Sequence, residues 1–117
     1  MTNFAIYYQS SNKPEIRIIN TIINKLANDN RNLKIHFFLS KKINFKYPTN
    51  SKIHICPTLK YLADTHSDRM YQSFLRFCEL KKIDYAFIPR LNYPEFFYND
   101  LSFKKKIRTK FILQDQS

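Results

Sequence analysis

Short apolar runs alternate along this chain with longer segments in which apolar residues recur every three or four positions. The short runs are rich in aromatic and β-branched residues and are followed by Gln, Ser or Pro, which is typical of buried strands. Pro57 and Pro89 follow two of these runs directly and predict where those strands end. The five expected strands cover residues 4–8, 33–39, 52–56, 84–88 and 108–113.

The first segment with helical spacing follows the first strand. Asn12 is placed to cap it, Pro14 is tolerated in its first turn, and Glu15 can reach back as in a capping box. The helix is expected to end at residues 28–30. Its apolar face consists of Ile16, Ile19, Ile22, Ile23 and Leu26.

Two more helices are expected further along the chain. A single turn is expected at residues 59–63. The second helix follows it, with Thr65 or Ser67 as its cap, and ends near Lys81 and Lys82. The third starts at residues 92–95, which repeat the Asn-x-Pro-Glu pattern of residues 12–15, and it ends near residue 101.

The alternation of strands and helices predicts one α/β domain over residues 1–117. We expect a single layered domain with about five strands and two to three helices. No helix is evident between the second and third strands, so that connection could return like a hairpin. The sheet is therefore expected to be mainly parallel or mixed.

The chain has 117 residues and contains no glycine. Glycine-rich phosphate loops, dinucleotide fingerprints and nucleophile elbows all depend on glycine, because they need positive φ or close backbone approach. These motifs are excluded in their standard form. Lone or helix-spaced carboxylates such as Asp64 and Asp68 form no evident acid–base pair. We therefore expect a protein that is not an enzyme and has no cofactor.

The charge balance indicates the class of partner. Lys and Arg together number 20 against nine Asp and Glu, a formal net charge of +11. A small domain with this charge attracts polyanions. We expect a non-catalytic factor associated with RNA or a ribonucleoprotein, such as a ribosome-bound protein, that binds through phosphate contacts. A protein-interaction module for an acidic partner is an alternative, and so is a basic surface that reflects compositional bias alone.

Two clusters and one further arginine are the candidate binding residues. Basic residues interleaved with aromatic rings can follow a phosphate backbone while the rings stack on bases. Phe45, Tyr47 and Phe103 are the rings concerned, although a place in the core is the favoured interpretation for them. The candidate nucleic-acid-binding residues are Lys41, Lys42, Lys46, Arg90, Lys104, Lys105, Lys106, Arg108 and Lys110.

The carboxyl ends of the strands offer a second argument for some of these residues. Ligands of open α/β sheets gather at that edge, where helix starts and polar loops meet. Lys41, Lys42 and Arg90 follow predicted strands and would lie there. The edge therefore suits a phosphate group, although Ser and Asn at helix starts also serve as ordinary caps.

The histidines and cysteines carry less information. His36 and His54 lie within strands, where we expect them to face solvent or to be hydrogen-bonded at an edge. His54 and Cys56 are two positions apart, which is weak support for zinc, and we expect no metal site. Cys78 is expected in the core, and both cysteines are read as reduced thiols.

The chain shows no segment that would direct it to a membrane. Its first residues lack the basic and apolar parts of a signal peptide, and no apolar run reaches the length of a span. We expect a cytoplasmic protein, although an organelle genome could also encode it without a targeting segment.

One resemblance provides a further alternative. The first strand, the Asn-x-Pro-Glu helix and the late strand over residues 110–115 resemble the first half of a two-domain glycosyltransferase. The resemblance implies a glycosyltransferase fragment or a nucleotide-binding α/β domain. The glycine-bearing first loop of that family is replaced here by Gln9-Ser10-Ser11, and the half that binds the sugar donor is missing.

Overall fold

The computed structural model shows one parallel β-sheet with helices on both faces. It describes residues 1–9, 12–30, 32–39, 41–55, 67–91, 94–104 and 106–115, with the backbone alone for residues 67–70 and 115. In chain order the elements are β1 (Thr2–Tyr8), α1 (Lys13–Asp29), β2 (Leu33–Leu39), β3 (Ser51–Ile55), α2 (Ser67–Leu80), β4 (Tyr85–Leu91), α3 (Pro94–Ser102) and β5 (Lys110–Asp115). The predicted α/β fold is confirmed.

The strands lie in the order β3-β2-β1-β4-β5, and every neighbouring pair is parallel. The order in which strands are added reverses beside β1, because α1 leads to β2 on one side of β1 while α2 leads to β4 on the other. A hairpin between the second and third strands is therefore wrong, since β2 and β3 run parallel with Phe37 opposite Ile53. The segment 41–50 makes this crossover, and its described residues contain no helix.

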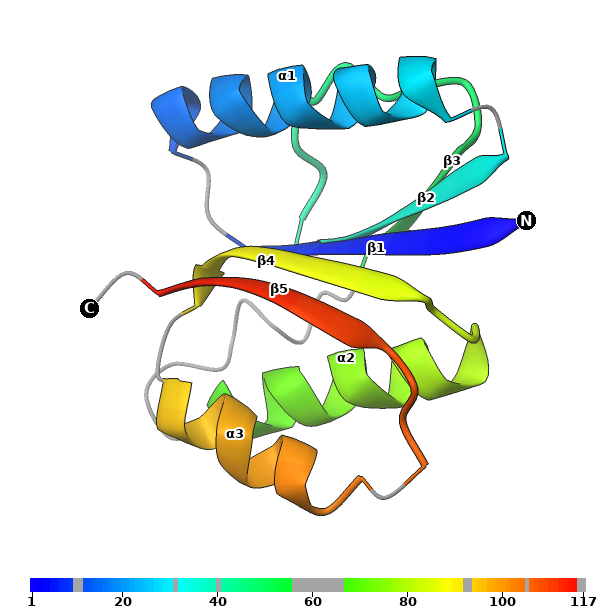
Figure 1. Ribbon diagram of the computed structural model, residues 1–117. Helices are drawn as coiled ribbons and strands as arrows, with labels where there is room; N and C mark the ends of the chain where they lie inside the picture. Colours follow the sequence, from blue (N-terminus) through cyan, green and yellow to red (C-terminus); the bar gives the residue numbers. More distant parts are fainter. Residues whose placement is uncertain are drawn as a thin grey trace.

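Figure 1 shows two layers of helix with the sheet between them. α1 and the segment 41–50 cover one face, while α2 and α3 cover the other. Alternation along β1 explains the arrangement: Ile6 and Tyr8 pack toward α1, whereas Ala5 and Tyr7 pack toward α2. The central strands β1 and β2 therefore bury both faces, which is why they read as continuous apolar runs, whereas the edge strand β3 is largely exposed.

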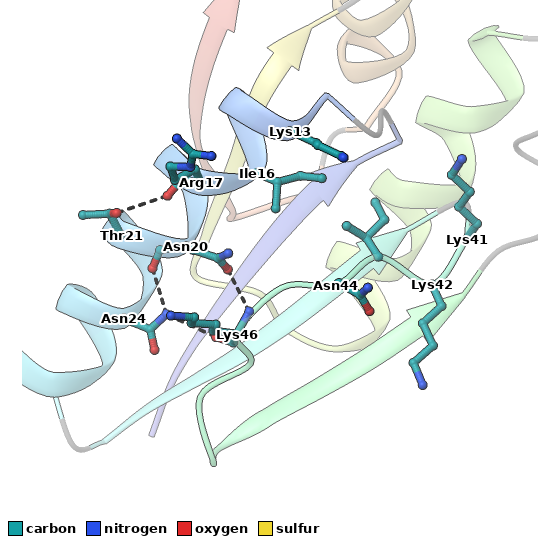
Figure 2. Close-up of a pocket in the computed structure, with 11 residues that line it drawn as sticks. Lys13, Ile16, Arg17, Asn20, Thr21, Asn24, Lys41, Lys42, Asn44 and Lys46 are labelled. Atoms are coloured by element: carbon teal, nitrogen blue, oxygen red, sulfur yellow. Dashed lines mark hydrogen bonds between the residues drawn. The ribbon is translucent and has the colours of Figure 1, made fainter.

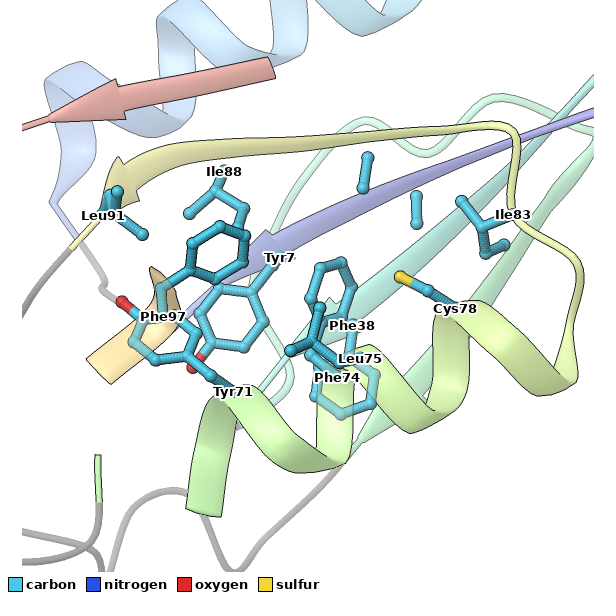
Figure 3. Close-up of a cluster of buried hydrophobic side chains, with 12 residues drawn as sticks. Tyr7, Phe38, Tyr71, Phe74, Leu75, Cys78, Ile83, Ile88, Leu91 and Phe97 are labelled. Atoms are coloured by element: carbon cyan, nitrogen blue, oxygen red, sulfur yellow. The ribbon is translucent and has the colours of Figure 1, made fainter. Parts of the chain in front are cut away.

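The core beneath α2 is dominated by aromatic rings (Figure 3). The Tyr7 ring lies 4.9 Å from that of Phe74 and 5.5 Å from that of Tyr71, measured between ring centroids. Phe97 of α3 contacts Tyr71 at 5.4 Å, so α3 is fixed through the same cluster. Cys78 lies in this core as expected, and burial raises the pKa of its thiol to about 12.

The start of α1 agrees with the sequence in one respect and differs in another. The Asn12 side chain caps the helix by accepting a hydrogen bond from the Glu15 backbone N–H at 3.0 Å. Among the described residues, the Glu15 side chain forms no capping-box hydrogen bond with the Asn12 backbone. Its carboxylate instead binds Arg90 and Tyr8, because a charged partner forms a stronger hydrogen bond than a backbone amide does.

The bounds of the last two strands also differ from expectation. β4 continues through Pro89 to Leu91, and its pairing with β5 is irregular between Ile88 and Leu91. Proline lacks a backbone donor, so the strand passes it at an interruption of the ladder instead of ending there. β5 begins at Lys110 instead of residue 108. The predicted turn at 59–63, the strand residue Cys56 and the cap at Thr65 lie outside the described residues.

Candidate functional site

A groove of about 960 Å³ runs between α1 and the segment after β2. Figure 2 shows its two walls: one face of α1 on one side, and residues 41–46 on the other. Five basic side chains line it, two from the helix and three from the segment: Lys13, Arg17, Lys41, Lys42 and Lys46. The fold therefore gathers charges that are separated in the chain.

The segment wall has its charges outward because its side chains alternate. Ile43 and Phe45 are buried among the side chains beneath α1, whereas Lys42, Asn44 and Lys46 are exposed. In an extended chain, successive side chains point to opposite sides. Burial of the two apolar residues thus directs the lysines toward solvent beside the helix.

Two asparagines of α1 hold this wall in place. The backbone N–H of Lys46 donates to Asn20 Oδ1 at 2.9 Å, and Asn24 Nδ2 donates to the carbonyl oxygen of Lys46 at 3.1 Å (Figure 2). Both backbone polar groups of Lys46 are therefore hydrogen-bonded to the helix. The two walls are fixed relative to each other, which favours a preformed site.

The charge of the groove is uncompensated. No Asp or Glu lines it, and none of its five basic side chains forms an ion pair within the described part of the chain. Sequence reasoning named Lys41, Lys42 and Lys46 but missed Lys13 and Arg17. Their separation of four residues, which places both on one helix face, was the available signal.

The second predicted cluster is partly neutralised. Lys104 forms an ion pair with Glu79 at 2.8 Å, and Arg108 lies 3.7 Å from Asp84. Lys106 and Lys110 are exposed. Lys105 lies outside the described residues. The structure therefore leaves less free positive charge here than the sequence suggests.

Arg90 forms an ion pair with Glu15 at the carboxyl edge of the sheet, at the start of α1. Its Nε lies 3.0 and 2.9 Å from the two carboxylate oxygens of Glu15, and the Tyr8 hydroxyl donates to Glu15 Oε1 at 2.9 Å. This is the point where the strand order reverses, the usual ligand position in open α/β sheets. Here a carboxylate of the chain itself neutralises the cation.

Replacing Glu15 with Gln is expected to lower the free energy of unfolding by about 1 kcal/mol, because Arg90 loses its charged partner. Glu95→Gln is the matched control, since Glu95 also lies in the first turn of a helix and forms no ion pair among the described residues. Urea unfolding of both variants measures the difference. Equal losses would show that the Arg90 contact contributes nothing beyond the helix dipole.

Of the three candidate stacking rings, the structure exposes one. Phe45 is buried, and Tyr47 is half-buried with its hydroxyl donating to the Ile43 carbonyl at 2.6 Å. Phe103 is 76% exposed but lies beside the second cluster and not in the groove. The groove therefore presents charge and amides, without a ring free to stack on a base.

The two strand histidines form a pair. His36 Nδ1 lies 3.2 Å from His54 Nε2, and His36 Nε2 lies 3.1 Å from Asn3 Oδ1. His36 is buried and hydrogen-bonded, so its ring does not face solvent. Burial is the main cause that lowers the pKa of His36 to about 4, followed by the charge of His54. Within the described residues, no group of three metal-ligating side chains comes together.

The depressed pKa of His36 predicts a loss of stability in acid. The unfolded chain binds this proton near pH 6.5 and the folded chain only near pH 4, so stability falls as the pH drops through that interval. Between pH 7 and 4.5 the wild type should lose about 2 kcal/mol more than His36→Gln. Urea unfolding at the two pH values tests this, and equal losses in both proteins would contradict it.

No helix in the described part of the chain is long and apolar enough to cross a membrane. The comparisons with known proteins give no relative: no family model, no curated protein and no solved structure matches the chain. The groove and its charges are therefore the basis for a functional conclusion.

Proposed function

We propose that this protein binds RNA, alone or within a ribonucleoprotein such as the ribosome, by placing the phosphate backbone in the groove beside α1. The observation that carries the proposal is the convergence on one groove of five basic side chains that form no ion pair among the described residues, with no carboxylate in the groove lining. Such a groove attracts a polyanion and concentrates its field. The formal net charge of +11 adds long-range attraction.

The groove supports contact with phosphates more than contact with bases. Lysine and arginine side chains at its walls suit phosphate oxygens, and no exposed aromatic ring lies among its lining residues. Contacts of this kind fix the position of a strand without reading its sequence. We therefore expect weak sequence preference and a strong dependence on salt.

The position beside Arg90 supports a nucleotide site less well. Glu15 holds Arg90 with both carboxylate oxygens at the start of α1, where a bound phosphate would have to displace it. The nucleotide-binding and glycosyltransferase alternatives depend on this edge of the sheet. The groove has no such competing carboxylate among its lining residues.

Titration of a fluorescent single-stranded RNA at several salt concentrations tests the proposal. If five phosphates are contacted, the logarithm of the affinity should fall against the logarithm of the salt concentration with a slope of about −3.5. No binding at low salt, or an affinity that salt does not change, would overturn the proposal.

Recovery of the tagged protein from cells before and after nuclease treatment distinguishes RNA binding from the protein-interaction alternative. An RNA tether is lost after nuclease, whereas a directly bound acidic protein survives it. A stoichiometric protein partner that survives nuclease would favour the protein-interaction alternative.

A further inference from the structure

A second basic surface lies on the opposite face of the sheet. Lys34 and His36 alternate along β2, Lys52 and His54 alternate along β3, and the register places His36 opposite Lys52. All four side chains therefore share one face. It is the face covered by α2, because the Phe77 ring lies 5.8 Å from that of His36 and 4.6 Å from that of His54. We call Lys34, Lys52, Lys81 and the two histidines the lysine–histidine face.

Lys81 completes this surface from the end of α2. Its backbone N–H donates to the carbonyl oxygen of Phe77, one turn earlier, and its charge acts on both histidines and on Lys34. The pKa of Lys34 is lowered mainly by a side-chain contact with Lys52. Burial and the charges of Lys52 and Lys81 lower it further. In the part of the chain that the structure describes, no carboxylate pairs with these lysines.

The hydrogen bonds assign the protons of the two imidazoles. Asn3 Oδ1 can only accept, so His36 Nε2 donates to it. His36 is neutral near pH 7, so its Nδ1 accepts from His54 Nε2. His54 Nδ1 is then the ring nitrogen that can take up a proton without breaking this chain. Protonation of His36 would instead set two N–H groups against each other.

We propose that the lysine–histidine face binds a phosphate dianion, either free or as a phosphomonoester. Lys34 is repelled by Lys52 and Lys81, and none of the three forms an ion pair in the described part of the chain. An anion of charge −2 relieves this repulsion, and a phosphodiester supplies only half of that charge. The site is separate from the RNA groove, which lies across the sheet.

The histidines favour binding over cleavage at this surface. General acid–base cleavage of a phosphodiester by an imidazole pair would require both rings to exchange protons with the substrate. His36 uses both of its ring nitrogens within the protein, so His54 alone is left for this purpose. The role of His54 is instead to take up positive charge when an anion is present. The charged groups that His54 senses are Lys34, Lys52 and Lys81.

Histidine NMR signals provide a local test in the full-length protein. At pH 7 and constant ionic strength in chloride, added inorganic phosphate should shift the ring signals of His36 and His54 along a saturating curve. Lys52→Gln should weaken this binding by at least about ten-fold, because it removes one of three cations. Lys25→Gln, an exposed lysine of α1, should leave the curve unchanged. Lys81→Gln, outside the strands, repeats the test if Lys52→Gln does not fold.

The outcomes separate this site from the groove. Glycerol 3-phosphate in place of inorganic phosphate identifies the source of the anion: equal affinities assign recognition to the phosphate group alone, and tighter binding of the ester assigns it to phosphomonoesters. Arg17→Gln should keep the histidine shifts even where it weakens RNA binding. Absent or non-saturating shifts with both probes, or shifts that Lys52→Gln and Lys25→Gln affect equally, would overturn the proposal.

Discussion

Reversing the charges of Arg17 and Lys42 together is expected to weaken RNA binding by at least about ten-fold at low salt. The two residues stand on opposite walls of the groove, one on α1 and one on the segment after β2. Replacing both with Glu puts two negative charges where phosphates are proposed to lie. The slope of affinity against salt should become shallower by about 1.4, which is about 0.7 for each lost phosphate contact on single-stranded RNA. Fluorescence titrations at four salt concentrations measure both quantities.

The control must separate the groove from the overall charge. Lys25→Glu combined with Arg76→Glu lowers the formal net charge by the same amount, and both residues are exposed and absent from the groove lining. This control should retain most of the affinity and nearly all of the slope. Equal losses in the two double variants would show that net charge, and not the groove, drives binding.

An unchanged affinity in the groove variant would place the contact elsewhere. The remaining candidates of the second cluster, Lys106 and Lys110, are exposed and would then be reversed in the same way. We expect a smaller effect from them, because Lys104 and Arg108 beside them already have acidic partners.

Replacing Phe74 with Ala is expected to lower the free energy of unfolding by about 3–5 kcal/mol. Phe74 is fully buried between α2 and the sheet, and its ring contacts those of Tyr7 at 4.9 Å and Phe38 at 5.3 Å. Truncation leaves a cavity that several large rings cannot collapse to fill, so contact energy is lost along with the burial of the ring itself. Urea unfolding followed by far-UV circular dichroism measures the change.

Phe103→Ala is the matched control for this substitution. Phe103 is 76% exposed, so the same change of residue should cost less than about 0.5 kcal/mol. A loss below about 1 kcal/mol for Phe74→Ala would contradict the packing of α2 against β1 and β2 described here.

The sequence predicts the elements of this protein well where the signal is local. Asn12 ahead of a helical apolar pattern predicts the start of α1, and the Asn12 side chain does cap that helix. The continuous apolar run from Phe4 to Tyr8 predicts a strand covered on both faces, as β1 is. Such patterns arise from the geometry of one helix or strand, so they can be recognised without knowing its neighbours.

Local patterns are insufficient where a partner comes from far along the chain. Glu15 fits a capping box by spacing, but Arg90 lies 75 residues away and its guanidinium takes the carboxylate instead. Pro89 fits a strand end, but β4 continues because the irregular pairing with β5 accommodates it. In both positions a contact made by folding outweighs a local preference.

The properties of the candidate site also come partly from the sequence and partly from the tertiary structure. The sequence by itself determined that the protein is basic, that it lacks glycine-based phosphate loops, and that strands alternate with helices. Only the tertiary structure decided that Lys13 and Arg17 stand beside Lys41, Lys42 and Lys46, and that Arg90 is neutralised. The physical reason is that side-chain periodicity is set within one element. Strand order, crossover path and burial of Ile43 and Phe45 instead depend on the free energy of the whole packed chain.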